Sequence, residues 1–125
     1  MKPKFRAWLK EEYRMTGVRE ITFFNDEVQM ISDVEDFYAY DEFELMQSTG
    51  LKDKNDKEIY DGDIVRFTLT DGFDYVVDEE GVVSYKLGAF YVVNGLDEFL
   101  ISEIYANEIE VVGNIYENPE LVGGK

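Results

Sequence analysis

Hydrophobic and polar residues alternate along most of this chain with a period of two, not the 3.6 of a helix. The stretch "GDIVRFTLTDG" shows the pattern most clearly, because it places Val65, Phe67 and Leu69 on one side of an extended segment. A period of two indicates β-strands with one buried face. The alternation therefore predicts a mainly β protein, with Phe67 directed into its core.

Short turn sequences divide the alternating segments into hairpins. The dipeptides Asn25-Asp26, Asp71-Gly72, Leu87-Gly88 and Asn94-Gly95 each separate two apolar runs, and Asn, Asp and Gly suit tight turns. Only the segment 98–106 has a rough helical spacing, which predicts one short helix there.

Strands and turns in this order predict a mainly β fold with one or two short helices. The chain has the length of one domain. Within a single domain 1–125 we expect an N-terminal β subdomain at 1–51, a connecting turn at 52–62, a small rolled sheet or SH3-like barrel at 63–117 and a loose tail at 118–125.

The composition excludes several kinds of chemistry. The chain has no cysteine and no histidine, so disulfides, thiolate nucleophiles, cysteine-based zinc sites and Ser-His-Asp triads are impossible. It also lacks the glycine spacing of phosphate-binding loops. We expect a protein that is not an enzyme, with no catalytic residue, no cofactor and no metal site.

The polar run "DKNDKE" invites a comparison with calcium-binding loops. An EF-hand loop that began at Asp53 would need glycine at its sixth position and glutamate at its twelfth. The chain has Glu58 and Ile64 at those positions. The run is therefore predicted to be a polar turn.

Charge is distributed unevenly along this acidic chain, whose net charge is −16. Residues 1–19 hold six basic and two acidic residues, whereas residues 20–51 hold nine acidic residues and residues 87–124 hold seven, both without a base. The acids either form a solvated surface or pair with the basic N-terminal segment, of the same chain or of a neighbouring subunit. Binding of duplex nucleic acid is disfavoured, because phosphates are held by clustered Lys and Arg.

No segment has the character of a secretion signal or of a membrane span. The N-terminal residues lack an apolar signal region, and no run of about 18 apolar residues occurs. We expect a cytoplasmic protein that does not bind membranes.

Aromatic residues cluster with acidic ones between residues 36 and 44. Platforms that stack nucleic-acid bases pair their rings with basic grooves, so this cluster is better interpreted as core or as a protein-binding surface. Trp8 is interpreted as either core or a subunit contact. The candidate interaction surface consists of Arg6, Trp8, Phe37, Tyr38, Tyr40, Asp41 and Glu42.

Three segments resemble the YopX family, small proteins encoded by phages and prophages. They are "KPKFRAWLKEEYRM" near the start, "LMQSTGLKDKNDKEIYDGDIV" in the middle and "EVVGNIYENPEL" near the end. The resemblance implies no established activity and no catalytic residues. The chain has Asn55-Asp56 where the family often shows Asn-Gly, and the acidic stretch 33–44 falls in the variable middle of the family.

These observations predict a non-enzymatic interaction module of a phage or prophage that contacts a host or phage protein, with self-association into a homo-oligomer as a further expectation. One alternative is an acidic mimic of nucleic acid that occupies a host DNA-binding protein. Another is direct nucleic-acid binding through the basic N-terminal segment.

Overall fold

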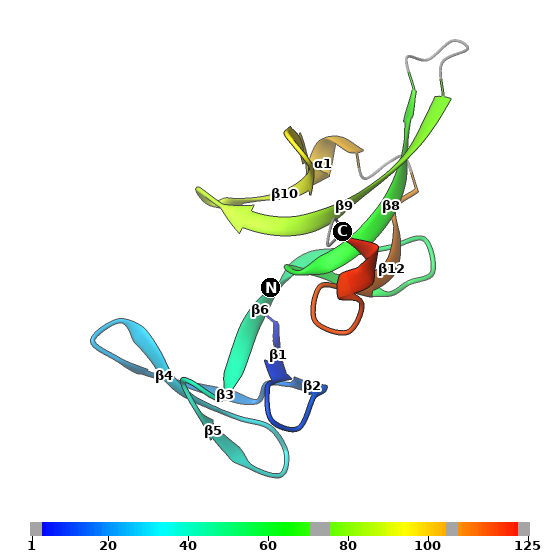
Figure 1. Cartoon of the computed structure of the whole chain (residues 1–125). Helices are drawn as coiled ribbons and strands as arrows, with labels where there is room; N and C mark the ends of the chain where they lie inside the picture. The colour runs from blue at the N-terminus through cyan, green and yellow to red at the C-terminus, as the bar shows by residue number, and fades with distance from the viewer. Residues whose placement is uncertain (1–3, 71–75, 105–107, 123–125) are drawn as a thin grey trace. The chain divides into compact units, whose positions relative to one another are not determined.

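Strands dominate the part of the chain that the structure, a computed structural model, describes: residues 4–70, 76–104 and 108–122. The mainly β prediction is confirmed (Figure 1). The chain divides into two compact units, Met1–Ser48 and Thr49–Lys125, and each is considered by itself. The division falls within one long strand, β6.

The first unit contains two small antiparallel sheets. One has the order β2-β1-β6 and the other the order β3-β4-β5. The strands are β1 (Phe5–Leu9), β2 (Arg14–Gly17), β3 (Glu20–Phe24), β4 (Glu27–Ser32), β5 (Phe37–Ala39) and β6 (Phe43–Lys52), the last continuing into the second unit.

The second unit is built on a five-stranded antiparallel sheet with the order β11-β10-β9-β8-β12. Its strands are β8 (Asp63–Thr70), β9 (Val76–Lys86), β10 (Ala89–Asn94), β11 (Asp97–Leu100) and β12 (Glu110–Asn114). The shorter elements are β7 (Glu58–Tyr60), which lies beside β6, the helical turn α1 (Ile101–Ile104) and the 3-10 turn η2 (Pro119–Leu121).

The core of the first unit lies between its two sheets. The side chains of Ala7 and Leu9 from β1 pack with Ile31, Tyr38 and Phe43. Ala7 and Leu9 share one face of β1, as the period of two predicts, and Trp8 between them is buried as well.

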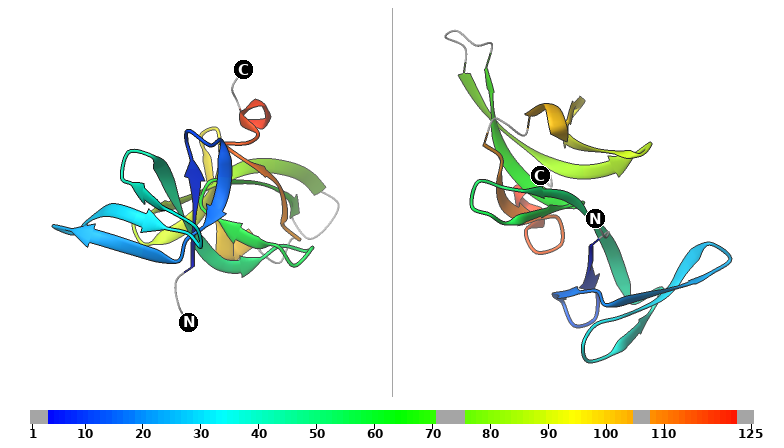
Figure 2. Two further views of the ribbon diagram at one scale, coloured as in Figure 1. Left: turned by 90° about the horizontal axis from the view of Figure 1, so that it is seen from below. Right: turned by 180° about the vertical axis from the view of Figure 1, so that it is seen from behind.

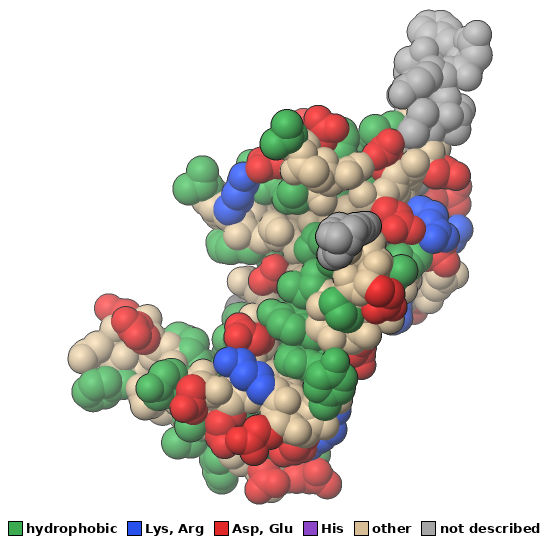
Figure 3. All heavy atoms as spheres, in the orientation of Figure 1, with side chains coloured by type: hydrophobic (Ala, Val, Ile, Leu, Met, Phe, Trp, Pro, Cys, Tyr) green, Lys and Arg blue, Asp and Glu red, His purple; other side chains and the backbone are tan. Residues whose placement is uncertain are grey.

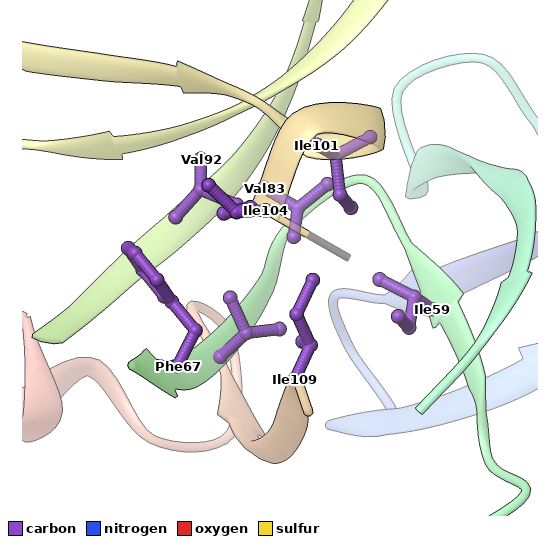
Figure 4. Close-up of a cluster of buried hydrophobic side chains, with 8 residues drawn as sticks. Ile59, Phe67, Val83, Val92, Ile101, Ile104 and Ile109 are labelled. Carbon is purple, nitrogen blue, oxygen red and sulfur yellow. The ribbon is translucent and has the colours of Figure 1, made fainter. Parts of the chain in front are cut away.

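The core of the second unit fills the concave side of the curled sheet (Figure 4). Phe67 is 1% exposed and meets Phe99 edge-on, with ring centroids 5.5 Å apart. Its predicted inward direction is confirmed. Around it lie aliphatic side chains from strands, from α1 and from the segment before β12: Ile59, Val65, Val83, Val92, Ile101, Ile104 and Ile109.

Gly81 allows the sheet to curl. It lies in β9 next to Val82, the last residue paired with β10, and a Cβ there would lie 2.7 Å from the carbonyl oxygen of Val93 and 2.6 Å from Cγ1 of Val92. A side chain at this position would push the two strands apart. The predicted rolled sheet is confirmed by the curvature visible in Figure 1, while the narrower likeness to SH3-like barrels stays a prediction.

Two predicted hairpin turns have the backbone that their strands require. Asn25 and Asp26 both have positive φ (51° and 65°), as do Leu87 and Gly88 (52° and 84°). Two successive positive φ angles are the signature of type I′ turns, whose twist matches that of the flanking strands. The predicted turn at Asp71-Gly72 lies outside the described residues.

The predicted helix at 98–106 is wrong in its first half. Phe99 and Leu100 belong to β11, which the turn at Gly95 folds back against β10. Pairing with β10 satisfies the backbone of these residues and overrides their helical spacing. The helix is reduced to Ile101–Ile104, and residues 105–107 lie outside the described part of the chain.

The polar run that follows β6 forms a turn, as predicted. One carboxylate holds this turn. Asp53 is 7% exposed, and its carboxylate accepts hydrogen bonds from the backbone N–H groups of Asn55 (2.9 Å), Lys57 (2.9 Å) and Val111 (2.8 Å). Burial alone would raise the pKa of Asp53, but these N–H groups more than offset it and lower the pKa. The predicted connecting turn also contains a strand, β7.

Amide side chains organise the segment after β12. The Oδ1 atom of Asn114 accepts from the backbone N–H groups of Tyr116 (3.0 Å) and Glu117 (2.8 Å), and Oδ1 of Asn118 accepts from that of Asn114 (3.2 Å). The region predicted as a loose tail therefore begins with an ordered turn that leads into η2.

Replacing Phe67 by alanine should lower the free energy of unfolding of the second unit by about 3–5 kcal/mol, because it leaves a cavity in a packed core. Leu96→Ala, at a fully exposed turn position, should change it by less than about 0.5 kcal/mol. Chemical denaturation of both variants checks the difference. Equal stabilities would show that Phe67 is not a core residue.

Replacing Leu87 by asparagine should stabilise the protein by about 1 kcal/mol. Leu87 is 98% exposed and has a φ of 52°, so its side chain contributes no packing while its backbone occupies a region costly for leucine and tolerated by asparagine. A higher thermal midpoint is expected, and an unchanged or lower midpoint would contradict the type I′ assignment.

Candidate functional site

The three-stranded sheet β3-β4-β5 has one covered face and one open face. Residues directly opposite each other on paired strands share a face. Ile21, Ile31 and Tyr38 are aligned across the three strands and face the core of the first unit. Their neighbours along each strand must therefore point the other way.

The open face carries large apolar side chains. The register aligns Thr22, Met30 and Ala39 across the sheet, with Phe24 and Phe37 farther along the flanking strands. Phe24 is 65% exposed, Phe37 70% and Met30 36%. These five residues are called the outer face below.

Further apolar side chains lie around the ends of the same sheet. Phe23, Val34 and Tyr40 are each at least 60% exposed. Figure 3 shows hydrophobic side chains on the surface of the part that carries β3, β4 and β5, next to acidic ones. Exposed apolar groups gathered over one small sheet are unusual for a surface that stays in water.

The β3–β4 hairpin extends past the short strand β5 as a two-stranded arm (Figure 2). A β-bulge shifts the register between Thr22 and Phe23, and bulges increase the local twist. Phe23 lies opposite Val28, which packs against the core, yet Phe23 itself is 60% exposed. The arm thus carries Phe23 and Phe24 beyond the region that the core can cover.

A buried carboxylate holds the loop that precedes β5. One oxygen of Asp33 accepts from the backbone N–H groups of Glu35 and Asp36, both at 2.8 Å, and the other accepts from the hydroxyl of Thr16 at 2.9 Å. The N–H groups of Asp36 and Glu35 lower the pKa of Asp33 below its ordinary value. Asp33 thereby positions Val34 and the start of β5, where Phe37 lies.

Glu42 closes the turn that carries Tyr40 and Asp41. Its Oε1 atom accepts from the backbone N–H of Ala39 at 2.7 Å, while its own N–H donates to the carbonyl oxygen of Ala39 at 2.9 Å. Tyr40 lies in this turn and is 63% exposed, whereas Tyr38 lies in β5 and is buried. Although they are two residues apart, Tyr38 and Tyr40 do not share a strand face, because β5 ends at Ala39.

The residues predicted as an interaction surface therefore separate into two groups. Phe37, Tyr40 and Asp41 are exposed. Trp8 and Tyr38 are buried, the former with its ring edge against Tyr13 at 4.9 Å between centroids. Trp8 is therefore buried within its own chain.

Arg6 and Glu42 complete that predicted set. Arg6 is half-buried in β1, opposite Met46. Glu42 is exposed and serves the turn described above.

Part of the basic N-terminal segment is neutralised within its own unit. Lys10 pairs with Glu44 at 3.2 Å, and Arg14 pairs with Glu12 at 2.8 Å and lies 3.8 Å from Asp33. The sequence left open whether the basic segment pairs with acids of the same chain or of a neighbouring subunit. For Lys10 and Arg14, pairing within the same chain is confirmed.

In the described residues, no three acidic side chains gather in a way that could hold a metal ion. A hollow of about 220 Å³ borders Phe37 and is lined by Arg19, Val34 and the loop around Asp33. No helix in the described ranges is long and apolar enough to cross a membrane.

Sequence reasoning missed Phe24 and Met30. The available signal was the pair Phe23-Phe24: consecutive residues of a strand point to opposite faces, so one of the two must face away from the core.

Comparisons with known proteins agree with this architecture. The model of the YopX protein family matches residues 4–123. The chain belongs to the YopX family. A crystal structure of protein EF1440 from Enterococcus faecalis is similar to it, with a TM-score of 0.72, 30% sequence identity and coverage of 98% of this chain and 99% of that one. A search of curated proteins gives no match.

The segments that carry the YopX resemblance use their polar side chains to hold backbone. In the middle segment, Asp53 binds three N–H groups, and Asp63, 1% exposed, accepts from the N–H of Tyr60 at 2.7 Å. In the final segment, Asn114 and Asn118 do the same. These residues of the YopX chain support the fold, and the outer face lies apart from them in the sequence.

The stability of the first unit should fall in acid, with a contribution from Asp33. Because its pKa is lowered in the folded state, Asp33 stabilises the fold above its ordinary pKa of 3.8. This contribution is lost as the pH falls from 3.8 through the lower folded value. Asp33→Asn should cost about 1–2 kcal/mol at pH 7, and the difference from the unmodified protein should shrink toward pH 3.

Glu35→Gln is the matched control, since it removes an exposed carboxylate from the same loop. It should change stability by less than about 0.5 kcal/mol. Denaturation of the three proteins between pH 3 and 7 makes the comparison. If the stability of Asp33→Asn stays below that of the unmodified protein by the same amount at every pH, the role of the charge is contradicted.

Proposed function

We propose that this YopX-family chain is a non-enzymatic interaction module of a phage or prophage that binds a host or phage protein through the outer face. The observation that carries the proposal is the exposure of Phe24, Met30 and Phe37 on one side of the β3-β4-β5 sheet. Aromatic residues and methionine are enriched at protein interfaces, and buried aromatic anchors contribute much of the binding free energy.

The charges around this face favour a partner with basic residues. Residues 20–51 contain nine acids and no base, and exposed carboxylates such as Glu20, Glu27 and Asp41 flank the outer face. Complementary charges at an interface rim speed association and select the partner. A second copy of the same face would bring like charges together, so a homo-oligomer would have to form through another surface.

An acidic mimic of nucleic acid is the second candidate. It is supported by the net charge of −16 and by the uninterrupted acidic character of residues 20–51. A mimic would bind mainly through carboxylates, whereas the interaction module would bind through apolar side chains as well. The two therefore differ in what happens when the aromatic residues are removed.

Direct binding of nucleic acid through the N-terminal segment has less support. Lys10 and Arg14 are engaged with Glu44 and Glu12, so their charges are not available as a cluster for phosphates.

Replacing Phe24 and Phe37 together by serine should abolish partner binding while leaving the fold intact. Both side chains are exposed by 65% or more, so the thermal midpoint should change little. Partner recovery from a lysate of the source bacterium should fall by about tenfold or more, equivalent to about 1.4 kcal/mol or more.

The matched control is the double replacement of Leu87 and Leu96 by serine, which removes two exposed leucines from turns of the second unit. It should retain the partner. Equal recovery with both double variants would refute the outer face as the binding surface. If both double variants recover the partner equally, and if binding is lost completely at high salt, the nucleic-acid mimic is favoured.

A further inference from the structure

The second unit contains a pocket beside β9, with a floor on the face of the five-stranded sheet opposite its core. Its volume is about 560 Å³, within the range of sites that bind small ligands or a few side chains. It lies where β10 ends and β9 continues, next to the C-terminal turn η2. No role for this pocket follows from the outer face, which is formed by the first unit.

The floor of the pocket is apolar. Ile64, Val82 and Val93 are aligned across three adjacent strands, because Val82 lies opposite Ile64 on one side and opposite Val93 on the other. Leu121 and Val122 form a wall beside this row. Ile64 lies on the face of β8 that also carries Arg66 and Thr68, yet it is 1% exposed, so this part of the sheet is apolar on both sides.

One side of the pocket is a strand edge. The pairing of β10 with β9 stops at Val82, whereas β8 pairs with β9 as far as Val76. Among the described strands, residues 78–81 of β9 therefore have a paired neighbour on one side only. An unpaired edge offers backbone N–H and C=O groups to an incoming extended chain.

The remaining side is acidic. Asp78, Glu79 and Glu80 line it, and no lysine or arginine occurs among the described residues that line the pocket. Glu80 is paired with Arg66 at 2.8 Å, Asp78 bonds to Thr68 at 3.1 Å, and Glu79 accepts from the amide of Asn94. Each carboxylate keeps further acceptor positions, so the pocket as a whole attracts cationic groups.

From these three properties we infer that the pocket binds an extended basic peptide segment of a partner protein. The segment would lie along residues 78–81 of β9, in line with β10, and hydrogen-bond to the free edge. Its apolar side chains would rest on Ile64, Val82 and Val93. Its lysine or arginine side chains would reach the carboxylates, with their aliphatic stems against the floor.

The same features argue against other occupants. The carboxylates repel an acidic peptide or a nucleic-acid strand. A small neutral molecule would use the apolar floor but neither the charge nor the strand edge. The inference is independent of the outer face, since no residue is shared between the two sites.

A heptapeptide of alternating valine and arginine, with blocked ends, is a suitable probe for the full-length protein. Its Kd can be measured by titration while the backbone amide signals are followed by NMR. The amides of residues 78–82 should shift. The same peptide N-methylated at alternate residues keeps its charge but cannot add as a strand, so it should bind about tenfold more weakly or worse.

Variants of the protein separate the pocket from general charge attraction. Asp78→Lys should weaken binding by about tenfold or more. Asp97→Lys, an identical charge change at an exposed position of β11, should weaken it by less than about threefold. The inference is overturned if the probe does not bind, if the N-methylated peptide binds equally well, or if both variants lose the same affinity.

Discussion

The carboxylate of Asp53 accepts hydrogen bonds from three backbone N–H groups, and one of them, on Val111, is 58 residues away in the sequence. The rest of the second unit depends on this kind of contact. Several of its strands, such as β7 and β11, are short, so backbone groups lie in turns where no ladder can satisfy them, and buried N–H groups without a partner are costly. Asp63 and Asn114 serve neighbouring corners, and Asp33 serves the first unit in the same way.

This use of polar side chains changes how the acidity of the chain is interpreted. Some carboxylates are structural, because they are buried and bound by backbone N–H groups. Others pair with nearby bases, as Glu44 does with Lys10. Some of the remaining acids border apolar side chains, as Glu27 does at the outer face and Asp78 does at the pocket beside β9. Both surfaces combine apolar contact area with negative charge, which is the basis for proposing partners with basic residues.

The sequence alone determined the class of fold and much of the core. Alternation placed Val65 and Phe67 on the buried face, and the turn dipeptides located the hairpins at residues 25–26 and 87–88. These features were predictable because strand periodicity and turn backbone depend on residues close together in the chain. The family resemblance was also readable from local motifs, and the match over residues 4–123 confirms it.

Tertiary structure decided which apolar residues remain on the surface. Phe24 and Phe37 are of a residue type usually buried in cores. They are exposed because the β3-β4-β5 sheet is covered on one face only. Phe99 and Leu100 have helical spacing, yet they form a strand because they pair with β10. Ile64 is buried although it lies on the face of β8 that also carries Arg66 and Thr68. In each case the outcome depends on which segment pairs with or packs against the strand, and the periodicity of the strand itself does not identify that segment.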